Sequence, residues 1–149
     1  MSRTFYELSM SFEKSTSGSF LRNFKLSVSF PGLIVRKLKA TSRDTHPVVL
    51  TQLQYKGWPD HGVPASTDDL LDVRRLMKTM RLKCLDPESP ILVHSSTGVG
   101  RTGTFIAFDN IASSIEKRGK TEDVNDIVQC VSNLREERCQ MVRPFSLLH

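Results

Sequence analysis

One stretch of this sequence, residues 90–115, constrains the fold more than any other. It opens with a short apolar run, Ile-Leu-Val at residues 91–93, of the length expected of a buried strand. A glycine-bearing turn follows, and beyond it apolar residues recur at a spacing that places them on one face of a helix: Phe105, Phe108, Ile111, Ala112 and Ile115. The sequence therefore predicts a strand, a tight loop and a helix in direct succession.

The loop at residues 94–101 precedes the predicted helix, a place that favours an anion. Unpaired backbone N–H groups and the positive end of the helix dipole meet there. Gly98 and Gly100 let the backbone curl, so that successive N–H groups can converge on phosphate oxygens. Arg101 can add a bidentate guanidinium. Taken alone, such a glycine-rich turn is equally compatible with a purely structural connection.

Two motifs resemble those of a known family. Residues 94–103 read His-Ser-Ser-Thr-Gly-Val-Gly-Arg-Thr-Gly, which resembles the signature loop of the cysteine-dependent protein tyrosine phosphatases, His-Cys-x-x-Gly-x-Gly-Arg-[Ser/Thr]-Gly. Residues 57–64 read Gly-Trp-Pro-Asp-His-Gly-Val-Pro and resemble the mobile acid loop of that family, Trp-Pro-Asp-x-Gly-x-Pro. The motifs occur in the family's order, which argues against coincidence, and the resemblance covers about residues 33–142.

The resemblance implies a role for each matching residue. Asp60 matches the general acid, Trp58 and Pro59 match the hinge of the acid loop, and Ser95 occupies the position of the nucleophile. By composition alone, Asp60 would be taken for a solvated turn residue. The resemblance also implies that His94 and Thr102 belong to the catalytic site, and it assigns the phosphate cradle to Ser95, Ser96, Thr97, Gly98, Val99, Gly100 and Arg101.

The sequence departs from the family pattern at the centre of the chemistry. Ser95 stands where the family has its nucleophilic cysteine. A serine hydroxyl does not ionise near pH 7, and the loop offers no neighbouring general base, because the matching family histidine faces the loop backbone. Residues 138–142 resemble the approach to the family's glutamine loop, but Arg143 and Pro144 follow where Gln-Thr is expected. The first 25 residues hold no counterpart of the family's phosphotyrosine-recognition loop, so we expect a domain truncated at both ends.

Three hypotheses about function remain open on the sequence. The first, which we favour, is a catalytically inactive phosphatase-like domain, a pseudophosphatase that binds phosphorylated partners. The second is a protein tyrosine phosphatase, acting through a phosphocysteine, whose cysteine was replaced by serine as a substrate trap. The third is a non-functional gene fragment.

The rest of the chain predicts a mixed α/β architecture. Residues 1–25 are rich in serine and are expected to be loosely ordered or to hold one poor strand, while residues 26–149 form the partial phosphatase-like domain. Strands are predicted at 26–30, 33–40 and 48–55, with turns at Arg43-Asp44 and between Pro87 and Pro90. A helix should begin at Ser66 or Thr67 and continue to about Lys83, and another should open at Glu122 and Asp123. Their apolar faces are Leu70, Val73, Met77 and Met80 in the first, and Val124, Ile127, Val128, Val131 and Leu134 in the last. Together these elements predict a twisted mixed sheet flanked by helices.

Composition narrows the partners. The formal charge of +5 comes from 21 basic and 16 acidic residues, but the basic residues are spread along the chain, so we expect no nucleic acid binding and a phosphotyrosine protein or another oxyanion as ligand. There is no apolar run long enough for membrane insertion, and the first residues lack the core of a signal peptide. Cys84, Cys130 and Cys139 show no metal-ligand spacing, so no metal or cofactor is expected, and their odd number suits a cytoplasmic location.

Overall fold

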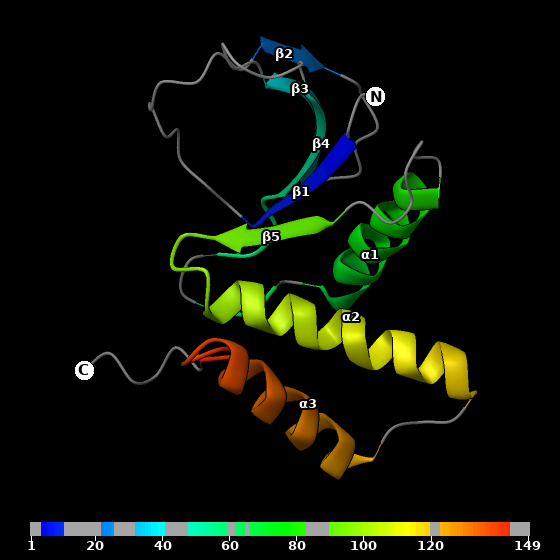
Figure 1. The fold of residues 1–149 in the computed structure, drawn as a ribbon, viewed down its shortest axis with the longest axis vertical. Helices are drawn as coiled ribbons and strands as arrows, with labels where there is room; N and C mark the ends of the chain where they lie inside the picture. Colours follow the sequence, from blue (N-terminus) through cyan, green and yellow to red (C-terminus); the bar gives the residue numbers. More distant parts are fainter. Residues whose placement is uncertain are drawn as a thin grey trace. The chain divides into compact units, whose positions relative to one another are not determined.

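The computed structural model of the chain describes residues 4–10, 22–25, 32–40, 48–59, 62–64, 66–82, 90–119 and 123–143, coloured in Figure 1. The chain divides into two compact units, Met1–Val93 and His94–His149. Each unit is taken by itself below.

A mixed sheet forms the centre of the first unit. Its strands are β1 (Thr4–Met10), β2 (Arg22–Lys25), β3 (Leu33–Ala40) and β4 (Val48–Tyr55), and β5 (Ile91–Ser95) enters this unit through its first residues. The strand order is β2-β3-β4-β1-β5. β1 pairs with β4 in parallel, whereas β2 with β3 and β3 with β4 are antiparallel. The predicted mixed sheet is confirmed, and β3 and β4 have the predicted bounds.

The first 25 residues contain more regular structure than the sequence predicts. Instead of one poor strand, they contribute both β1 and β2. β1 pairs with β4 along its whole length, from Thr4 opposite Val49 to Met10 opposite Tyr55. Hydrogen bonds to a neighbouring strand make this segment regular even though its own side-chain pattern is weak. The predicted strand at 26–30, the turn at Arg43-Asp44 and Pro87 lie outside the described residues.

The core of the first unit lies on one face of β3 and β4. The register places Leu33 opposite Tyr55 and Val35 opposite Leu53, and all four side chains are buried. Because side chains alternate along a strand, these residues lie on one face of β3 and of β4. Helix α1 (Thr67–Leu82) contacts β4 and adds its own apolar side chains, Leu70, Val73 and Met77, to the buried set.

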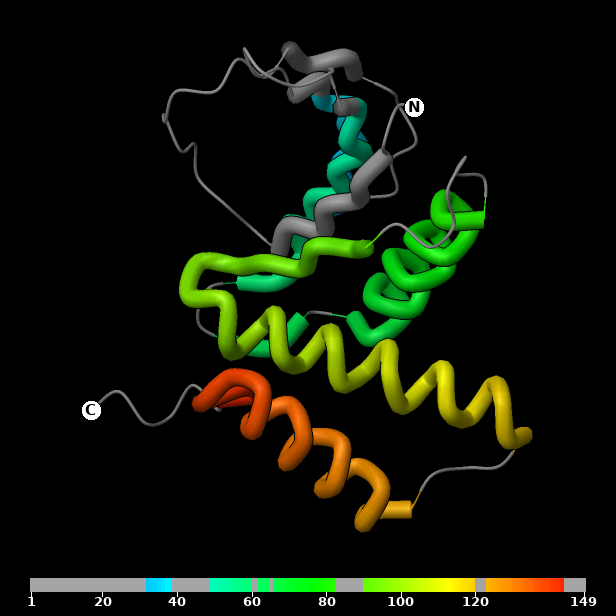
Figure 2. Tube along the Cα trace, in the orientation of Figure 1, coloured from blue at the N-terminus to red at the C-terminus, as the bar shows by residue number. Residues whose placement is uncertain are grey.

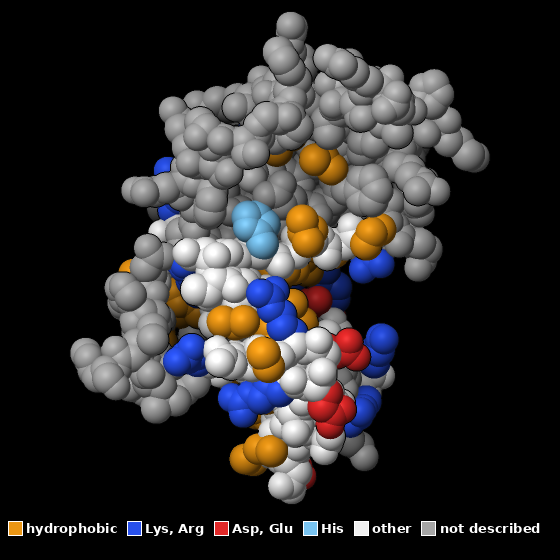
Figure 3. Space-filling view, turned by 60° about the vertical axis from the view of Figure 1, so that its left-hand side comes forward, with side chains coloured by type: hydrophobic (Ala, Val, Ile, Leu, Met, Phe, Trp, Pro, Cys, Tyr) orange, Lys and Arg blue, Asp and Glu red, His pale blue; other side chains and the backbone are white. Residues whose placement is uncertain are grey.

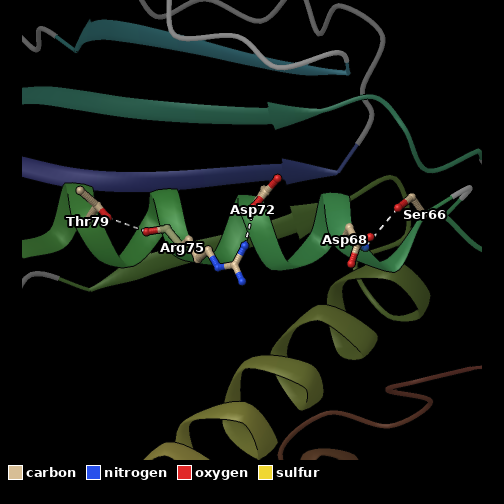
Figure 4. Close-up of polar contacts among 5 residues, drawn as sticks. All are labelled: Ser66, Asp68, Asp72, Arg75 and Thr79. Atoms are coloured by element: carbon tan, nitrogen blue, oxygen red, sulfur yellow. Dashed lines mark hydrogen bonds and ion pairs between the residues drawn. The ribbon is translucent and has the colours of Figure 1, made fainter.

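The start of α1 follows the predicted capping pattern. The Ser66 hydroxyl accepts a hydrogen bond from the Asp68 backbone N–H at 3.1 Å, so Ser66 is the cap (Figure 4). Asp68 and Asp69 stand in the first turn, where they complement the positive end of the helix dipole. Further along, Arg75 pairs with Asp72 at 2.9 Å on the exposed surface, and Thr79 donates to the Arg75 carbonyl at 2.8 Å.

The second unit is a helix pair. α2 (Gly100–Arg118) and α3 (Val124–Glu137) pack side by side and run in opposite directions (Figure 2). Phe105 is buried in α2 and meets Phe108 edge to face, with ring centroids 6.2 Å apart. Gly119 ends α2 in the left-handed conformation and donates its N–H to the Ile115 carbonyl.

Two expectations about burial are wrong. β5 was expected to be a buried strand, but Leu92 is 62% exposed and Ser95 alone in this strand is buried. α3 begins where the sequence predicts, with Asp123 as its cap, but none of its residues is buried, and Val124 and Val128 are 74% and 62% exposed. A single helix partner covers only one stripe of α3, so the rest of its apolar face stays open.

Candidate phosphate-binding site

The first unit contains the acid-loop motif. Trp58, directly after β4, is 4% exposed, and its indole N–H donates to the Gly62 carbonyl at 3.0 Å. This bond closes the loop on itself and buries the indole, while Pro59 is exposed. The general-acid position, Asp60, lies outside the described residues, so its role and the hinge role of Trp58 stay predictions.

A buried tyrosine links the two elements on either side of this loop. Tyr55, the last residue of β4, is 0% exposed, and its hydroxyl donates to the Asp69 carboxylate at 3.0 Å. Burial first, and then the hydrogen bond and negative charge of Asp69, raise the pKa of Tyr55 to about 12. The phenol therefore stays protonated and ties β4 to the first turn of α1. The sequence alone does not predict this contact, because the two residues are 14 positions apart.

The second unit contains the loop predicted to bind phosphate. β5 ends at Ser95, four residues form a bend, and α2 begins at Gly100. The cap residue Val99 provides no side-chain hydrogen bond, and the first turn of α2 has no acidic residue. The first N–H groups of α2 are therefore not closed by a carboxylate of its own first turn, which is the arrangement that suits an external anion.

The nucleophile position is buried and paired. Ser95 is 8% exposed, and its Oγ lies 2.8 Å from Oγ1 of Thr102, which is 4% exposed. Two predicted site residues are thus brought together across the loop. Two hydroxyls can exchange donor and acceptor roles, but neither titrates near neutral pH. Of the other predicted residues, Gly98 is buried, Ser96 and Thr97 are exposed, and His94, Val99, Gly100 and Arg101 are half-buried.

The segment after α3 lies directly against this loop. The Val142 N–H donates to the Val99 carbonyl at 3.1 Å, and the Gly103 N–H donates to the same oxygen at 3.1 Å. Gly103 permits this approach, because a Cβ at that position would collide with the backbone nitrogen of Val142 and lie 3.2 Å from the carbonyl carbon of Met141. Met141 is itself 5% exposed. Two segments about 40 residues apart in the sequence therefore meet backbone to backbone.

Arg138 completes this contact, and sequence reasoning assigned it no role. Arg138 is the cap residue at the C-terminal end of α3, and its guanidinium donates a hydrogen bond to the Thr97 carbonyl at 3.3 Å. The signal was present in the resemblance of residues 138–142 to the family's glutamine-loop approach, but a long-range side-chain contact cannot be derived from spacing. Arg143, which stands where the family has glutamine, is half-buried and donates to the Gln140 side chain at 3.0 Å.

Charge is distributed without a single dominant patch on the face drawn in Figure 3. Over the described part of that face, Lys and Arg side chains alternate with acidic, apolar and uncharged ones. In the described part of the chain, none of the helices has the length and hydropathy needed to span a bilayer.

The fold is α/β, and a tight turn joins β5 directly to α2, with Arg101 in the first turn of that helix. The family model for protein-tyrosine phosphatase matches residues 5–148. The chain therefore belongs to the protein-tyrosine phosphatase family.

Known relatives agree with this membership. The chain is 47% identical over 100 residues to receptor-type tyrosine-protein phosphatase eta of Mus musculus, a match that covers 67% of this chain. It is 40% identical over 129 residues to receptor-type tyrosine-protein phosphatase C of Rattus norvegicus, covering 80% of this chain. It is 35% identical over 124 residues to tyrosine-protein phosphatase non-receptor type 20 of Mus musculus, covering 83% of this chain. The matches span 8%, 9% and 26% of the lengths of these relatives.

Proposed function

We propose that this chain is a tyrosine-phosphatase-like domain that binds phosphorylated proteins or other oxyanions at residues 95–101 without hydrolysing them. One observation carries the proposal. The loop keeps the glycines, the uncapped helix start and Arg101, while the buried group at the nucleophile position is a serine hydroxyl paired with Thr102.

The loss of turnover follows from the chemistry of position 95. In the family, a cysteine thiolate attacks phosphorus, the acid-loop aspartate protonates the leaving phenol, and water then hydrolyses the phosphocysteine. The thiolate exists at neutral pH because its surroundings lower the thiol pKa. A serine hydroxyl would have to give its proton to a base at the moment of attack. Its hydrogen-bond partner, the Thr102 hydroxyl, cannot act as that base. Removing a catalytic nucleophile from a hydrolase costs on the order of a millionfold in kcat.

Binding depends on different groups and should survive. The N–H groups of the loop, the start of α2 and the Arg101 guanidinium require no sulfur. A neutral hydroxyl at position 95 also lacks the negative charge with which a thiolate would repel phosphate. A domain with this loop is therefore suited to hold a phosphoryl group without cleaving it.

Two measurements on the purified chain test this proposal. Hydrolysis of p-nitrophenyl phosphate should not exceed a buffer blank. Tungstate, an oxyanion that mimics phosphate, should bind in calorimetry, and Arg101→Ala should abolish that binding. Hydrolysis that disappears in Arg101→Ala would refute the claim of inactivity, and equal tungstate binding by both proteins would refute the claim of an oxyanion site at this loop.

The substrate-trap alternative is favoured by one feature of the sequence, which retains both the acid-loop residues Trp58, Pro59 and Asp60 and the signature arginine Arg101. Ser95→Cys separates the two readings. We expect at most weak activity in this variant, because Arg143 replaces the glutamine that positions the hydrolytic water in the family. Rates typical of the family in Ser95→Cys would instead support an active parent enzyme.

A further inference from the structure

We propose that Arg138 is a positioning residue for the phosphate loop, and that it acts from the end of α3 by fixing the direction of the loop's backbone N–H groups. This inference rests on the proposed function, since it assumes that the loop receives an oxyanion. The end of α3 lies beside the start of α2 (Figure 1).

The contact between Arg138 and the loop is close and specific. Nη2 of Arg138 lies 3.3 Å from the Thr97 carbonyl oxygen and donates a hydrogen bond to it. The two terminal nitrogens also lie 3.1 and 3.3 Å from the point that a Cβ on Gly98 would occupy. Gly98 is buried and has a φ of +69°, a conformation that favours glycine. The guanidinium thus fills the space that any side chain at residue 98 would need.

Peptide geometry converts this contact into an orientation of the loop. In a trans peptide the carbonyl and the following N–H point in opposite directions. With the Thr97 carbonyl directed at Arg138, the Gly98 N–H must point away from the end of α3. The Val99 carbonyl accepts from the Val142 N–H, so the Gly100 N–H must also point away. Alternate N–H groups of the loop are thereby turned to the side left for an oxyanion.

The segment that carries these contacts is itself held firmly. The Arg138 N–H donates to the Leu134 carbonyl at 3.0 Å, and Nε of Arg135 donates to the Met141 carbonyl at 3.0 Å. Gln140 and Val142 have φ values of +66° and +57°, which are costly for residues with a side chain, and most of all for a β-branched one. Such strain persists only where surrounding contacts impose it. The turn is therefore a rigid support for the loop.

Arg138 also contributes charge. The guanidinium is positively charged, and it meets the loop on its carbonyl side. A positive group behind the peptide planes reinforces their dipoles toward an anion on the opposite side. Hydrogen bond and charge thus act in the same direction.

Arg138→Ala and Arg138→Lys test the assignment, with Arg118→Ala as the matched control. Arg118 lies in the last turn of α2, at the opposite end of that helix from the loop, and its removal changes the charge of the unit equally. Tungstate affinity by calorimetry should fall about tenfold in Arg138→Ala, since a hydrogen bond from a charged donor is lost. Arg138→Lys should lose roughly threefold, because it keeps a charged donor but not the planar fork. The control should bind like wild type.

Amide hydrogen exchange of the ligand-free chain provides the second readout. The Gly98 N–H should exchange faster in Arg138→Ala, while amides in the middle of α2 should keep their protection. Unchanged Gly98 exchange together with unchanged tungstate affinity, in a variant series where Arg101→Ala still abolishes binding, would overturn the role of Arg138 and leave the oxyanion site intact. Failure of the wild type to bind tungstate would instead refute the proposed function, and the exchange comparison would still decide whether Arg138 orders the loop. If Arg138→Ala does not fold, Arg138→Lys decides: wild-type affinity and exchange would overturn the inference, and the intermediate loss would support it.

Discussion

The starts of α3 and α2 differ in what satisfies their backbone N–H groups. At α3, the Asp123 carboxylate accepts hydrogen bonds from the N–H groups of Asn125 and Asp126 at 2.6 and 3.0 Å. The Asp126 carboxylate in turn accepts a hydrogen bond from the Asp123 N–H at 3.4 Å. At α2, the cap residue Val99 provides no such bond and the first turn has no acid. α3 therefore has a carboxylate of its own at its N-terminus, whereas neither the cap residue nor the first turn of α2 provides one.

The start of α1 resembles that of α3. Ser66 caps α1, and Asp68 and Asp69 stand in its first turn. A self-capped start gains stability but has no need of a ligand. The start of α2 is supported by the backbone of residues 138–143 on its carbonyl side instead. The starts of α1 and α3 are thus capped by side chains of nearby residues, whereas the start of α2 is held through backbone contacts with a segment distant in sequence.

The largest effect is expected from a substitution where the start of α2 contacts the backbone of residues 138–143. Gly103→Ala should destabilise the fold by about 3 kcal/mol, because the added Cβ would collide with the Val142 backbone and break its bond to Val99. Helix propensity alone predicts the opposite sign, a gain of about 1 kcal/mol. Chemical denaturation measures the change.

A control for this substitution is Asn110→Ala on the exposed side of the same helix, which should change stability by less than about 0.5 kcal/mol. Wild-type stability in Gly103→Ala would show that residues 138–143 do not bear on the start of α2.

The next effect tests the open start of α2 directly. Val99→Asp places a fixed carboxylate at the cap of α2, where α3 has Asp123. It should reduce tungstate affinity roughly tenfold, because the new charge competes with the ligand for the helix start. Val99→Asn, isosteric but neutral, separates charge from shape. Equal losses in the two variants would mean that packing, and not charge, governs the site.

A smaller effect concerns Asp69, an acid in the first turn of α1. Tyr55→Phe should cost about 1 to 2 kcal/mol, because Asp69 loses the donor that Tyr55 supplies within the protein. A double-mutant cycle with Asp69→Asn should show that the two changes are not additive. Additive losses would place the stabilisation in some other contact of Tyr55.

The same pair predicts a dependence on pH. The pKa of Tyr55 rises from 10.0 to about 12 on folding, so the unfolded chain releases this proton first as the pH increases. The stabilising contribution is therefore fully present below pH 10.0 and is lost between that value and about pH 12. The stability difference between wild type and Tyr55→Phe should narrow over this window in denaturation at each pH. A constant difference would contradict the assignment.

The smallest expected effect is the loss of the α3 cap. Asp123→Ala should destabilise the fold by about 1 kcal/mol and leave tungstate affinity unchanged, because the cap lies at the far end of α3 from Arg138. Asp123→Asn should retain most of the stability. A change in tungstate affinity would show that the two helix starts are coupled.

Local sequence patterns predicted β3, β4, α1, α2 and α3 because their signals lie within a few residues of each other. Ser66 and Asp123 mark the starts of α1 and α3, because each side chain accepts hydrogen bonds from N–H groups two or three positions further along the chain. The regularity of β1 was missed because its hydrogen-bond partners lie on β4, about 45 residues later. The exposure of Leu92 and Val124 was missed because burial depends on what covers an element, and not on the element's own composition.

For the candidate site, the sequence by itself determined the motif, the order of its residues and the serine at position 95. Those features need only the identity of neighbouring residues. The tertiary structure decided that Arg138 and Val142 hold the carbonyls of the loop, that Thr102 pairs with Ser95, and that Tyr55 reaches Asp69. Arg138 and Thr97, for example, are 41 positions apart, and only the packing of whole helices and strands brings such residues within hydrogen-bonding distance.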